Sequence, residues 1–99
     1  MFIETITRVK NSNNSWAAST NNQIAFLNVL QNANGLISYN TNTVNDSSYI
    51  ITRTWNSIQD YQNFFSNSVN QTLYFQSNFD RISQELTLII SDTVTYSSN

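Results

Sequence analysis

Polar and apolar positions alternate with a period of two at the start of the chain. Side chains that alternate in this way along a strand point to opposite faces of a sheet. The pattern predicts a strand over residues 2–10. One face would carry Phe2, Glu4, Ile6 and Arg8, and the other Ile3, Thr5, Thr7 and Val9. The polar run NSNNS ends the strand, and the isolated Trp16 is expected to plug one end of the core.

A helical pattern replaces the alternation after residue 19. Ile24, Leu27 and Leu30 recur every three residues, which is a spacing typical of one face of a helix. Ser19 or Thr20 is the expected N-cap, because a hydroxyl oxygen can accept a hydrogen bond from the first turn. Gly35, the only glycine of the chain, is predicted to adopt a left-handed conformation and to close this helix.

The middle of the chain has the pattern of a hairpin followed by a helix. Residues 36–44 and 49–55 are rich in β-branched and aromatic types and flank the turn sequence NDSS at 45–48. After Trp55 the spacing becomes helical, with Ile58, Tyr61 and Phe65 on one stripe. Ser57 and Asp60 are placed as a helix cap. The sequence SNS at 66–68 is expected to interrupt this helix.

The last third of the chain predicts a second helical stripe and a final strand. Phe75, Phe79 and Ile82 form the stripe, which we assign to the core, while Asp80 and Arg81 are assigned to a solvated face. The strand is predicted over residues 86–96. Its inward-facing residues would be Leu86, Leu88, Ile90, Val94 and Tyr96, and its outward-facing residues Thr87, Thr93 and Thr95.

The order of these elements is β-α-β-β-α-β, the ferredoxin-like α+β arrangement with an antiparallel sheet, in a single domain over residues 1–99. In such a sheet the second strand normally lies at an edge. Edge strands usually carry a charge or a proline that prevents open pairing, and LISYNTNTV has neither. We therefore expect a homodimer formed through sheet packing and edge-strand contacts.

Composition narrows the classes of function. Asn, Ser and Thr make up 42 of the 99 residues, and charged residues make up only 10%, a neutral surface common on virion, exported or assembly-forming proteins. Four cations and a net charge of −2 give no basic footprint for nucleic acid. No apolar run is long enough to span a membrane, and the N-terminus lacks the features of a signal peptide. We expect a location in the cytoplasm, host cytoplasm or virion.

The absence of histidine and cysteine excludes Ser-His-Asp catalysis and cysteine chemistry. The six acidic residues show no metal-ligand spacing, and the single glycine excludes a glycine-rich phosphate loop. Carboxylates and a perturbed Tyr or Lys are the bases that remain. We expect no metal and no cofactor.

The stretch NGLISYNTNTVNDSSYIITRTWNSIQDYQNFF resembles the centre of the antibiotic biosynthesis monooxygenase (ABM) family of dimeric α+β barrels. In that family a helix ends in Gly, and a strand of the form Gly-hydrophobic-x-x-Tyr follows. The next strand ends in Trp and a small polar residue, which lead into an amphipathic helix. Those positions are Gly35, Tyr39, Trp55 and Ser57 here. The resemblance implies a dimeric α+β barrel.

Departures from the family narrow what the resemblance implies. Haem-degrading relatives use a His in the helix after the Trp, where this chain has Phe64 and Phe65, and an Asn in the first strand, which is also missing. The resemblance therefore leaves a cofactor-independent monooxygenase or isomerase that acts on a small aromatic or quinol-like molecule. The alternative is a non-catalytic dimerisation, assembly or ligand-binding module, for instance in a virus. The sequence leaves open whether the protein is an enzyme.

Five residues are candidates for a ligand pocket: Glu4, Arg8, Tyr39, Arg53 and Trp55. In the functional interpretation, Glu4, Arg8 and Arg53 border a cavity, and Trp55 and Tyr39 pack on a planar ligand. In the structural interpretation, a Glu-Arg pair links neighbouring strands and Trp55 is part of the core; both are ordinary features of sheets. Asp92 interrupts an inward face, so it either pairs with an arginine or lies at a strand end in solvent.

Overall fold

The computed structural model describes residues 1–98, without the side chains of residues 85–87. Its element order confirms the predicted arrangement, with the second helical segment divided in two. The elements are β1 (Phe2–Lys10), α1 (Asn21–Gln31), β2 (Leu36–Asn45), β3 (Ser48–Trp55), α2 (Ile58–Ser66), α3 (Ser68–Leu88) and β4 (Ile90–Ser98). None of the helices in the described part of the chain is long and apolar enough to cross a membrane.

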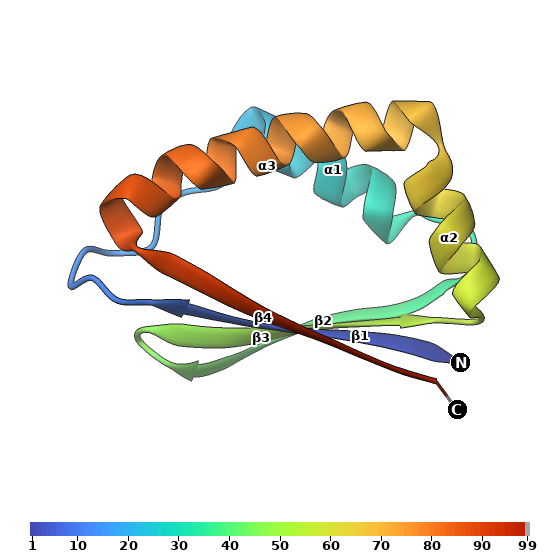
Figure 1. Cartoon of the computed structure of the whole chain (residues 1–99), viewed down its shortest axis with the longest axis horizontal. Coiled ribbons are helices and arrows are strands. Elements are labelled where there is room, and N and C mark those ends of the chain that lie inside the picture. Colours follow the sequence, from blue (N-terminus) through green and yellow to red (C-terminus); the bar gives the residue numbers. More distant parts are fainter. Residues whose placement is uncertain (99) are drawn as a thin grey trace.

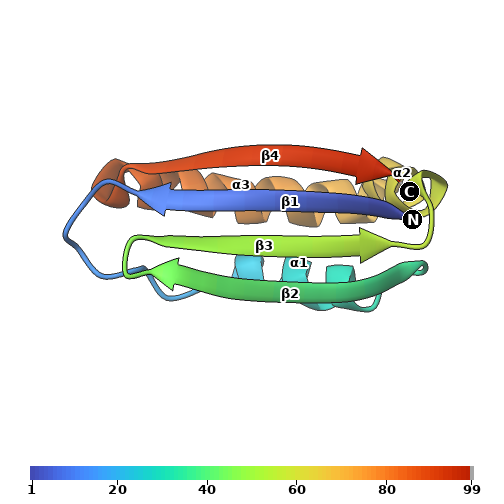
Figure 2. The same cartoon turned by 90° about the horizontal axis from the view of Figure 1, so that it is seen from below.

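The four strands form one sheet in the order β2-β3-β1-β4, with every neighbouring pair antiparallel (Figure 2). The second strand therefore lies at an edge, as predicted. The register pairs Glu4 with Arg53 and Arg8 with Asp92 across β1. The paired positions between them form the opposite side, which we call the outer sheet face. It includes Ile3, Thr5, Thr7, Val9, Asn40, Asn42, Ile50, Thr52, Thr54, Ser91, Thr93 and Thr95.

All three helices lie on one side of the sheet, so the outer sheet face is left without a covering layer (Figure 1). The buried core is concentrated at one end, where Phe2, Phe26, Leu30, Trp55 and Phe64 pack together. Trp55 is fully buried. Thr20 caps α1, because its hydroxyl accepts a hydrogen bond from the Gln23 backbone N–H while the Gln23 side chain accepts from the Thr20 backbone N–H. The prediction that offered Thr20 as the cap is confirmed.

Gly35 has the predicted left-handed conformation, with φ of 83°. It lies after the turn that follows α1 rather than at the helix end itself. A methyl group on its Cα would overlap the side chain of Asp60 in the first turn of α2. That turn is capped by Ser57, whose Oγ accepts from the Asp60 N–H at 3.2 Å and donates to the Asp60 carboxylate at 3.0 Å. Gly35 is thus required both by its φ and by the close approach of α2.

The boundary between α3 and the last strand was predicted wrongly. The helix continues to Leu88, and β4 begins at Ile90. The sequence LTLII alternates as a strand would, but its first residues extend a helix that already has tertiary contacts with α1 and α2. Ile89 makes the transition with φ of 52°. The predicted inward and outward directions of Leu86 and Thr87 lie outside the described side chains.

The assignment of Phe75, Phe79 and Ile82 to the core was also wrong, because these side chains are 64%, 70% and 49% exposed. The face of α3 that points towards the sheet carries Tyr74, Ser77, Asn78, Arg81 and Gln84 instead. The reason is that this face borders a cavity with charged groups rather than a packed core.

Candidate ligand-binding cavity

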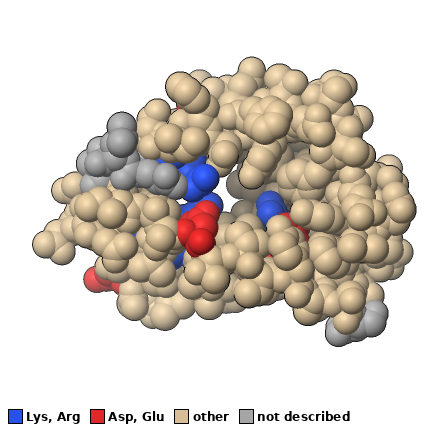
Figure 3. All heavy atoms as spheres, in the orientation of Figure 1, with Lys and Arg blue, Asp and Glu red and all other residues tan. Residues whose placement is uncertain are grey.

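A cavity of about 630 Å³ lies between the sheet and the helices. Figure 3 shows the corresponding face of the molecule hollowed, with positively and negatively charged side chains gathered at the hollow. Side chains from every strand and every helix contribute to its wall. Its volume falls within the range of roughly 300–1,000 Å³ that is usual for small-molecule sites, so an aromatic molecule of one to three rings would fit.

The floor of the cavity holds a buried charge network between β1 and β3. Glu4 is only 2% exposed. Its carboxylate accepts a hydrogen bond of 2.8 Å from Trp55 Nε1 and one of 3.0 Å from Arg53 Nη2. The register of the two strands brings these groups together, because Glu4 is directly opposite Arg53 and Phe2 is opposite Trp55. The network fixes the position of the Arg53 guanidinium beside the cavity.

Arg53 has a donor that the protein itself does not satisfy. Its side chain is 12% exposed, and its Nε–H is buried without a hydrogen-bond partner. The guanidinium carbon lies 5.9 Å from the centre of the Phe65 ring. A buried polar group without a partner costs roughly 1–3 kcal/mol, and such groups are rare enough to require an explanation. An acceptor oxygen on a ligand would satisfy this donor if it displaced the side chains that shield Nε from the cavity.

A second charged group joins β1, β4 and α3. Arg8 donates through Nε and Nη2 to the two Asp92 oxygens, both at 2.8 Å, and Arg81 Nη1 lies 3.7 Å from Asp92 Oδ2. Arg8 also donates to the Tyr49 hydroxyl. Burial alone would lower the pKa of Arg8, but the hydrogen bonds and charge attraction from Asp92 and Tyr49 outweigh it and raise that pKa.

These contacts decide two of the predictions. The expectation that Asp92 pairs with an arginine is confirmed, and Asp92 is at the same time an exposed residue near the start of β4. The assignment of Asp80 and Arg81 to a solvated face was wrong: Asp80 accepts from Thr20 Oγ1 and Asn22 Nδ2, and Arg81 donates to Asn78 Oδ1.

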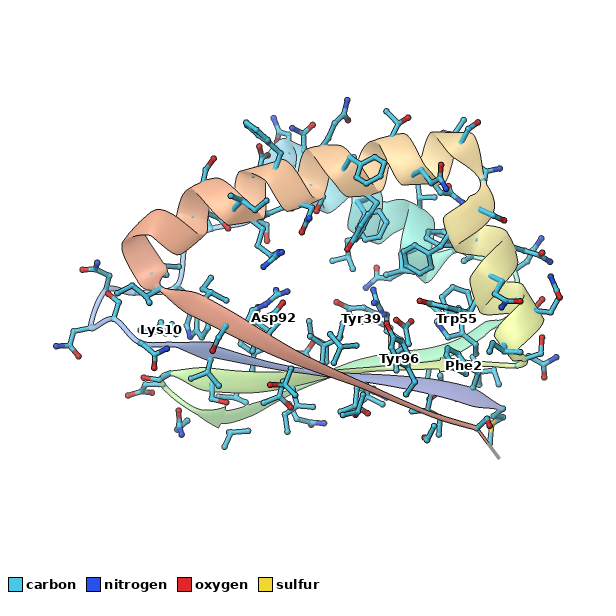
Figure 4. All side chains as sticks on the ribbon, in the orientation of Figure 1. Phe2, Lys10, Tyr39, Trp55, Asp92 and Tyr96 are labelled. Atoms are coloured by element: carbon cyan, nitrogen blue, oxygen red, sulfur yellow. The ribbon has the colours of Figure 1, made fainter. Side chains whose placement is uncertain are left out.

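All five tyrosines of the chain line the cavity: Tyr39, Tyr49, Tyr61, Tyr74 and Tyr96. Figure 4 shows Tyr39 and Tyr96 pointing from the sheet into the space below the helices. Burial raises the pKa of Tyr39 and of Tyr61, and the hydrogen bond to Tyr96 raises that of Tyr61 further. These two phenols are therefore neutral at physiological pH and present a hydroxyl and a ring face, not a base.

Trp16 forms an end wall of the cavity, where the sequence predicted a plug for the core. Its ring packs edge-on against Tyr49 at 5.0 Å, and its Nε1 donates to the Asp46 carbonyl. The ammonium of Lys10 lies 5.5 Å from the Trp16 ring and donates to the carbonyls of Ser12 and Asn14. The connection between β1 and α1 is thereby held against the sheet.

The structure brings four of the five candidate residues to the cavity wall: Glu4, Arg8, Tyr39 and Arg53. Trp55 contributes no surface to the wall; it is fully buried in the core, where its Nε1 donates a hydrogen bond to the Glu4 carboxylate. Sequence reasoning missed Tyr49 and Tyr61 as wall residues, although Tyr49 shares the face of Arg53 on β3. It also missed Arg81 as a wall residue. Arg81 lies on a polar face of α3, and nothing in the sequence indicates that this face points towards the sheet. Among the described side chains, no three carboxylates come together as a metal site would need.

The whole chain can be superimposed on solved structures of low sequence identity. Rv0793 from Mycobacterium tuberculosis has a TM-score of 0.64 at 12% identity, over 100% of this chain and 95% of that one. A candidate antibiotic biosynthesis monooxygenase from Deinococcus radiodurans has a TM-score of 0.56 at 13% identity, over 100% and 92%. The fold is ABM-like. The resemblance predicted from Gly35, Tyr39, Trp55 and Ser57 is thus confirmed at the level of the fold.

A third ABM-like structure is SnoaB from Streptomyces nogalater, a cofactor-independent oxygenase solved as the N63A mutant. It has a TM-score of 0.54 at 9% identity, over 99% of this chain and 92% of that one. No family model matches the sequence, and no curated protein matches it either. Identities this low show a shared ABM-like fold, and the activity has to be argued from the cavity.

Proposed function

We propose that this ABM-like protein binds a small quinol-like aromatic molecule in the cavity and oxidises it without a cofactor. The observation that carries the proposal is the Arg53 Nε–H, a buried donor without a protein partner beside a cavity of about 630 Å³. A phenolic or quinone oxygen supplies the missing acceptor, and the tyrosine rings and Phe65 supply faces for a planar ligand.

The chemistry would depend on the substrate more than on a side-chain base. Glu4 and Asp92 are both held by arginines, and Tyr39 and Tyr61 have raised pKa values. A guanidinium beside a phenol favours its phenolate form, and an electron-rich phenolate can transfer electrons to dioxygen. In a dihydroxynaphthalene with a free position para to the phenol, that phenolic O–H and the para C–H both break. One oxygen atom of dioxygen becomes a carbonyl oxygen at the para carbon, and the phenol carbon becomes the second carbonyl of a quinone. The other oxygen leaves as water with the two hydrogens. The protein would bind, orient and shield the reacting ring.

Binding of a dihydroxynaphthalene, followed by calorimetry, tests the proposal. We expect Arg53→Lys to weaken binding by about tenfold or more, since a hydrogen bond to a charged group contributes about 1.5–3 kcal/mol. The lysine keeps the charge beside Glu4 but has no equivalent of Nε. Val69→Gln, at a 65% exposed position that does not line the cavity, is the matched control. An unchanged affinity of the Arg53→Lys variant for the dihydroxynaphthalene would contradict the proposal that Arg53 binds the ligand.

Oxygen consumption separates the proposed oxygenase from its alternative, a non-catalytic binding module. The pairing of both cavity carboxylates with arginines is the observation that favours the alternative. Oxygen uptake that saturates with ligand and is lost in Arg53→Lys supports catalysis. Tight binding without oxygen uptake would leave the binding proposal intact and exclude the oxygenase.

The proposal includes a homodimer formed through the outer sheet face. Its charge-free threonine, isoleucine and asparagine side chains lack the features that keep sheets apart in solution. We expect light scattering to give a dimer at micromolar concentration. Thr5→Lys together with Thr52→Lys, which puts two charges on paired positions, should give monomers. A wild-type monomer would refute this part of the proposal.

A further inference from the structure

The helix α3 is amphipathic in the opposite sense to an ordinary surface helix. Its inner face carries polar groups such as Ser77, Arg81 and Gln84, which border the cavity. Its large apolar side chains, Phe75 and Phe79 above all, point away from the rest of the protein and are 64% and 70% exposed. A helix normally places such residues against a core. Their exposure on a chain with so little surface charge indicates a further contact.

The outward residues have the spacing of a coiled-coil interface. They are Ser68, Thr72, Phe75, Phe79 and Ile82, separated alternately by four and three residues, and we call them the α3 seam. This is the a/d pattern with which two helices pack knobs into holes. All five are exposed. At 1.5 Å per residue, the 21-residue helix is about 32 Å long, which gives a straight surface along the top of the molecule (Figure 1).

The chemistry beside the seam favours a second copy of this chain as the occupant. The flanking positions Val69, Gln71, Gln76 and Ser83 are uncharged, and the acidic Glu85 comes only after the last seam residue in the sequence. The charged Asp80 is engaged by Thr20 and Asn22 from α1, and Arg81 lines the cavity. The described part of the seam therefore offers no charge by which a different protein or an anionic membrane would be selected. A second copy of this chain needs no complementary charge to pack here, because the described part of the seam has no like charges that would repel it.

We propose that two copies pack α3 against α3 across a two-fold axis. The helix dipoles favour an antiparallel pair. The four seam residues from Thr72 to Ile82 are spaced symmetrically about residue 77, so that Phe75 of one copy meets Phe79 of the other, and Thr72 meets Ile82. Such self-complementarity is what an isologous interface requires.

The exposed area predicts a weak interface. With about 200 Å² per phenylalanine, the two phenyl side chains leave roughly 270 Å² exposed in each copy. A standard interface buries about 800 Å² per partner, so the α3 seam would associate in the upper micromolar range. It lies on the side of the molecule opposite the outer sheet face (Figure 1), so it would join sheet-mediated dimers into larger assemblies.

Sedimentation velocity from low micromolar to near-millimolar concentration tests the inference. For the wild type we expect the mass to double in this range. Phe75→Gln and Phe79→Gln should each raise the midpoint concentration by about tenfold or more, as the loss of a central aromatic does at interfaces. Ile58→Gln is the matched control, because Ile58 is 50% exposed and lies on α2, outside the seam and its flanking positions. Equal behaviour of Phe79→Gln and wild type would overturn the inference.

The test is independent of the proposed function. In the Thr5→Lys/Thr52→Lys background, which removes the sheet contact, α3 association should still convert monomers into dimers. If sheet dimerisation fails but the Phe79-dependent doubling remains, only the earlier proposal is wrong. If the sheet dimer forms and no Phe79-dependent step follows, only this inference is wrong.

Cross-linking tests the antiparallel arrangement, and the chain has no cysteine to interfere. Under mild oxidation, Thr72→Cys/Ile82→Cys should form disulfide-linked dimers at high yield. Thr72→Cys alone should not, because its two copies would lie far apart. The two positions cannot react within one helix, since they are about 15 Å apart along its axis. Efficient dimers from Thr72→Cys alone would overturn the antiparallel pairing.

Discussion

Replacing Glu4 with glutamine should reveal how much the folded state depends on the buried network beneath the cavity. The glutamine oxygen can still accept from Trp55 Nε1, but its amide group would then face the Arg53 guanidinium, donor against donor. Breaking one side of a buried ion pair costs about 3–5 kcal/mol. Because Arg53 borders the cavity and keeps 12% exposure, we expect the lower end, about 3 kcal/mol. For a domain of this size that lowers the melting temperature by roughly 12 °C.

The assay is urea denaturation followed by tryptophan fluorescence, with a double-mutant cycle as its control. Arg53→Met alone should cost a similar amount, because it leaves the Glu4 carboxylate buried with only the Trp55 N–H. Glu4→Gln/Arg53→Met should cost only about 1 kcal/mol, since neither charge is left without its partner, which gives a coupling of several kcal/mol. A double variant that costs as much as the two single variants together would refute the argument. So would a cost below about 1 kcal/mol for Glu4→Gln.

Three further predictions concern the backbone and the tyrosines. Gly35→Ala should lower the free energy of unfolding, measured in urea, by about 2–4 kcal/mol. The alanine would have to adopt a left-handed φ, and its methyl group would push Asp60 away from Ser57 at the start of α2. An unchanged free energy of unfolding would contradict the close approach of Gly35 and Asp60. Ile89→Asn should stabilise by about 1 kcal/mol, because Asn tolerates the positive φ of an exposed position where Ile is strained, and a lower melting temperature would count against it. Burial raises the pKa of Tyr61 above that of the unfolded chain, about 10, so its contribution to stability is complete below pH 10 and is lost as the pH rises beyond it. Phenolate absorbance should show a late-titrating fraction that shrinks in Tyr61→Phe.

The order of the elements along the chain and most of their boundaries follow from local patterns in the sequence. The period-two alternation of β1 and the turn sequence before Ser48 both fall where the structure has them. Gly35 and Ser57 are informative because each satisfies a backbone requirement that few other residues meet. These predictions succeed because the hydrogen bonds and backbone angles that define a cap or a turn involve only residues that are close together in the sequence.

The features that sequence reasoning missed depend on distant parts of the chain. Asp92 was expected to pair with an arginine, but its partner Arg8 is 84 residues away, and nothing near either residue identifies that partner. The outward direction of Phe75 and Phe79 follows from the cavity below α3, which exists only once the sheet and all three helices are assembled. An apolar stripe in the sequence shows that one face of a helix is apolar. It does not show whether that face packs against the rest of the same chain or stays exposed.

The placement of the few charges connects the cavity with the two uncharged surfaces. Arg8, Arg53 and Arg81 line the cavity, and Lys10 is only 7% exposed. All four cations of the chain are therefore drawn away from the exterior, although buried arginines cost desolvation energy that their carboxylates only offset. That cost is explained if the arginines position and recognise an acceptor-bearing ligand. The same distribution leaves the outer sheet face and the α3 seam without described charges, and surfaces that lack repulsion associate readily. The proposed ligand recognition inside and the proposed self-association outside would thus be two consequences of one arrangement of charge.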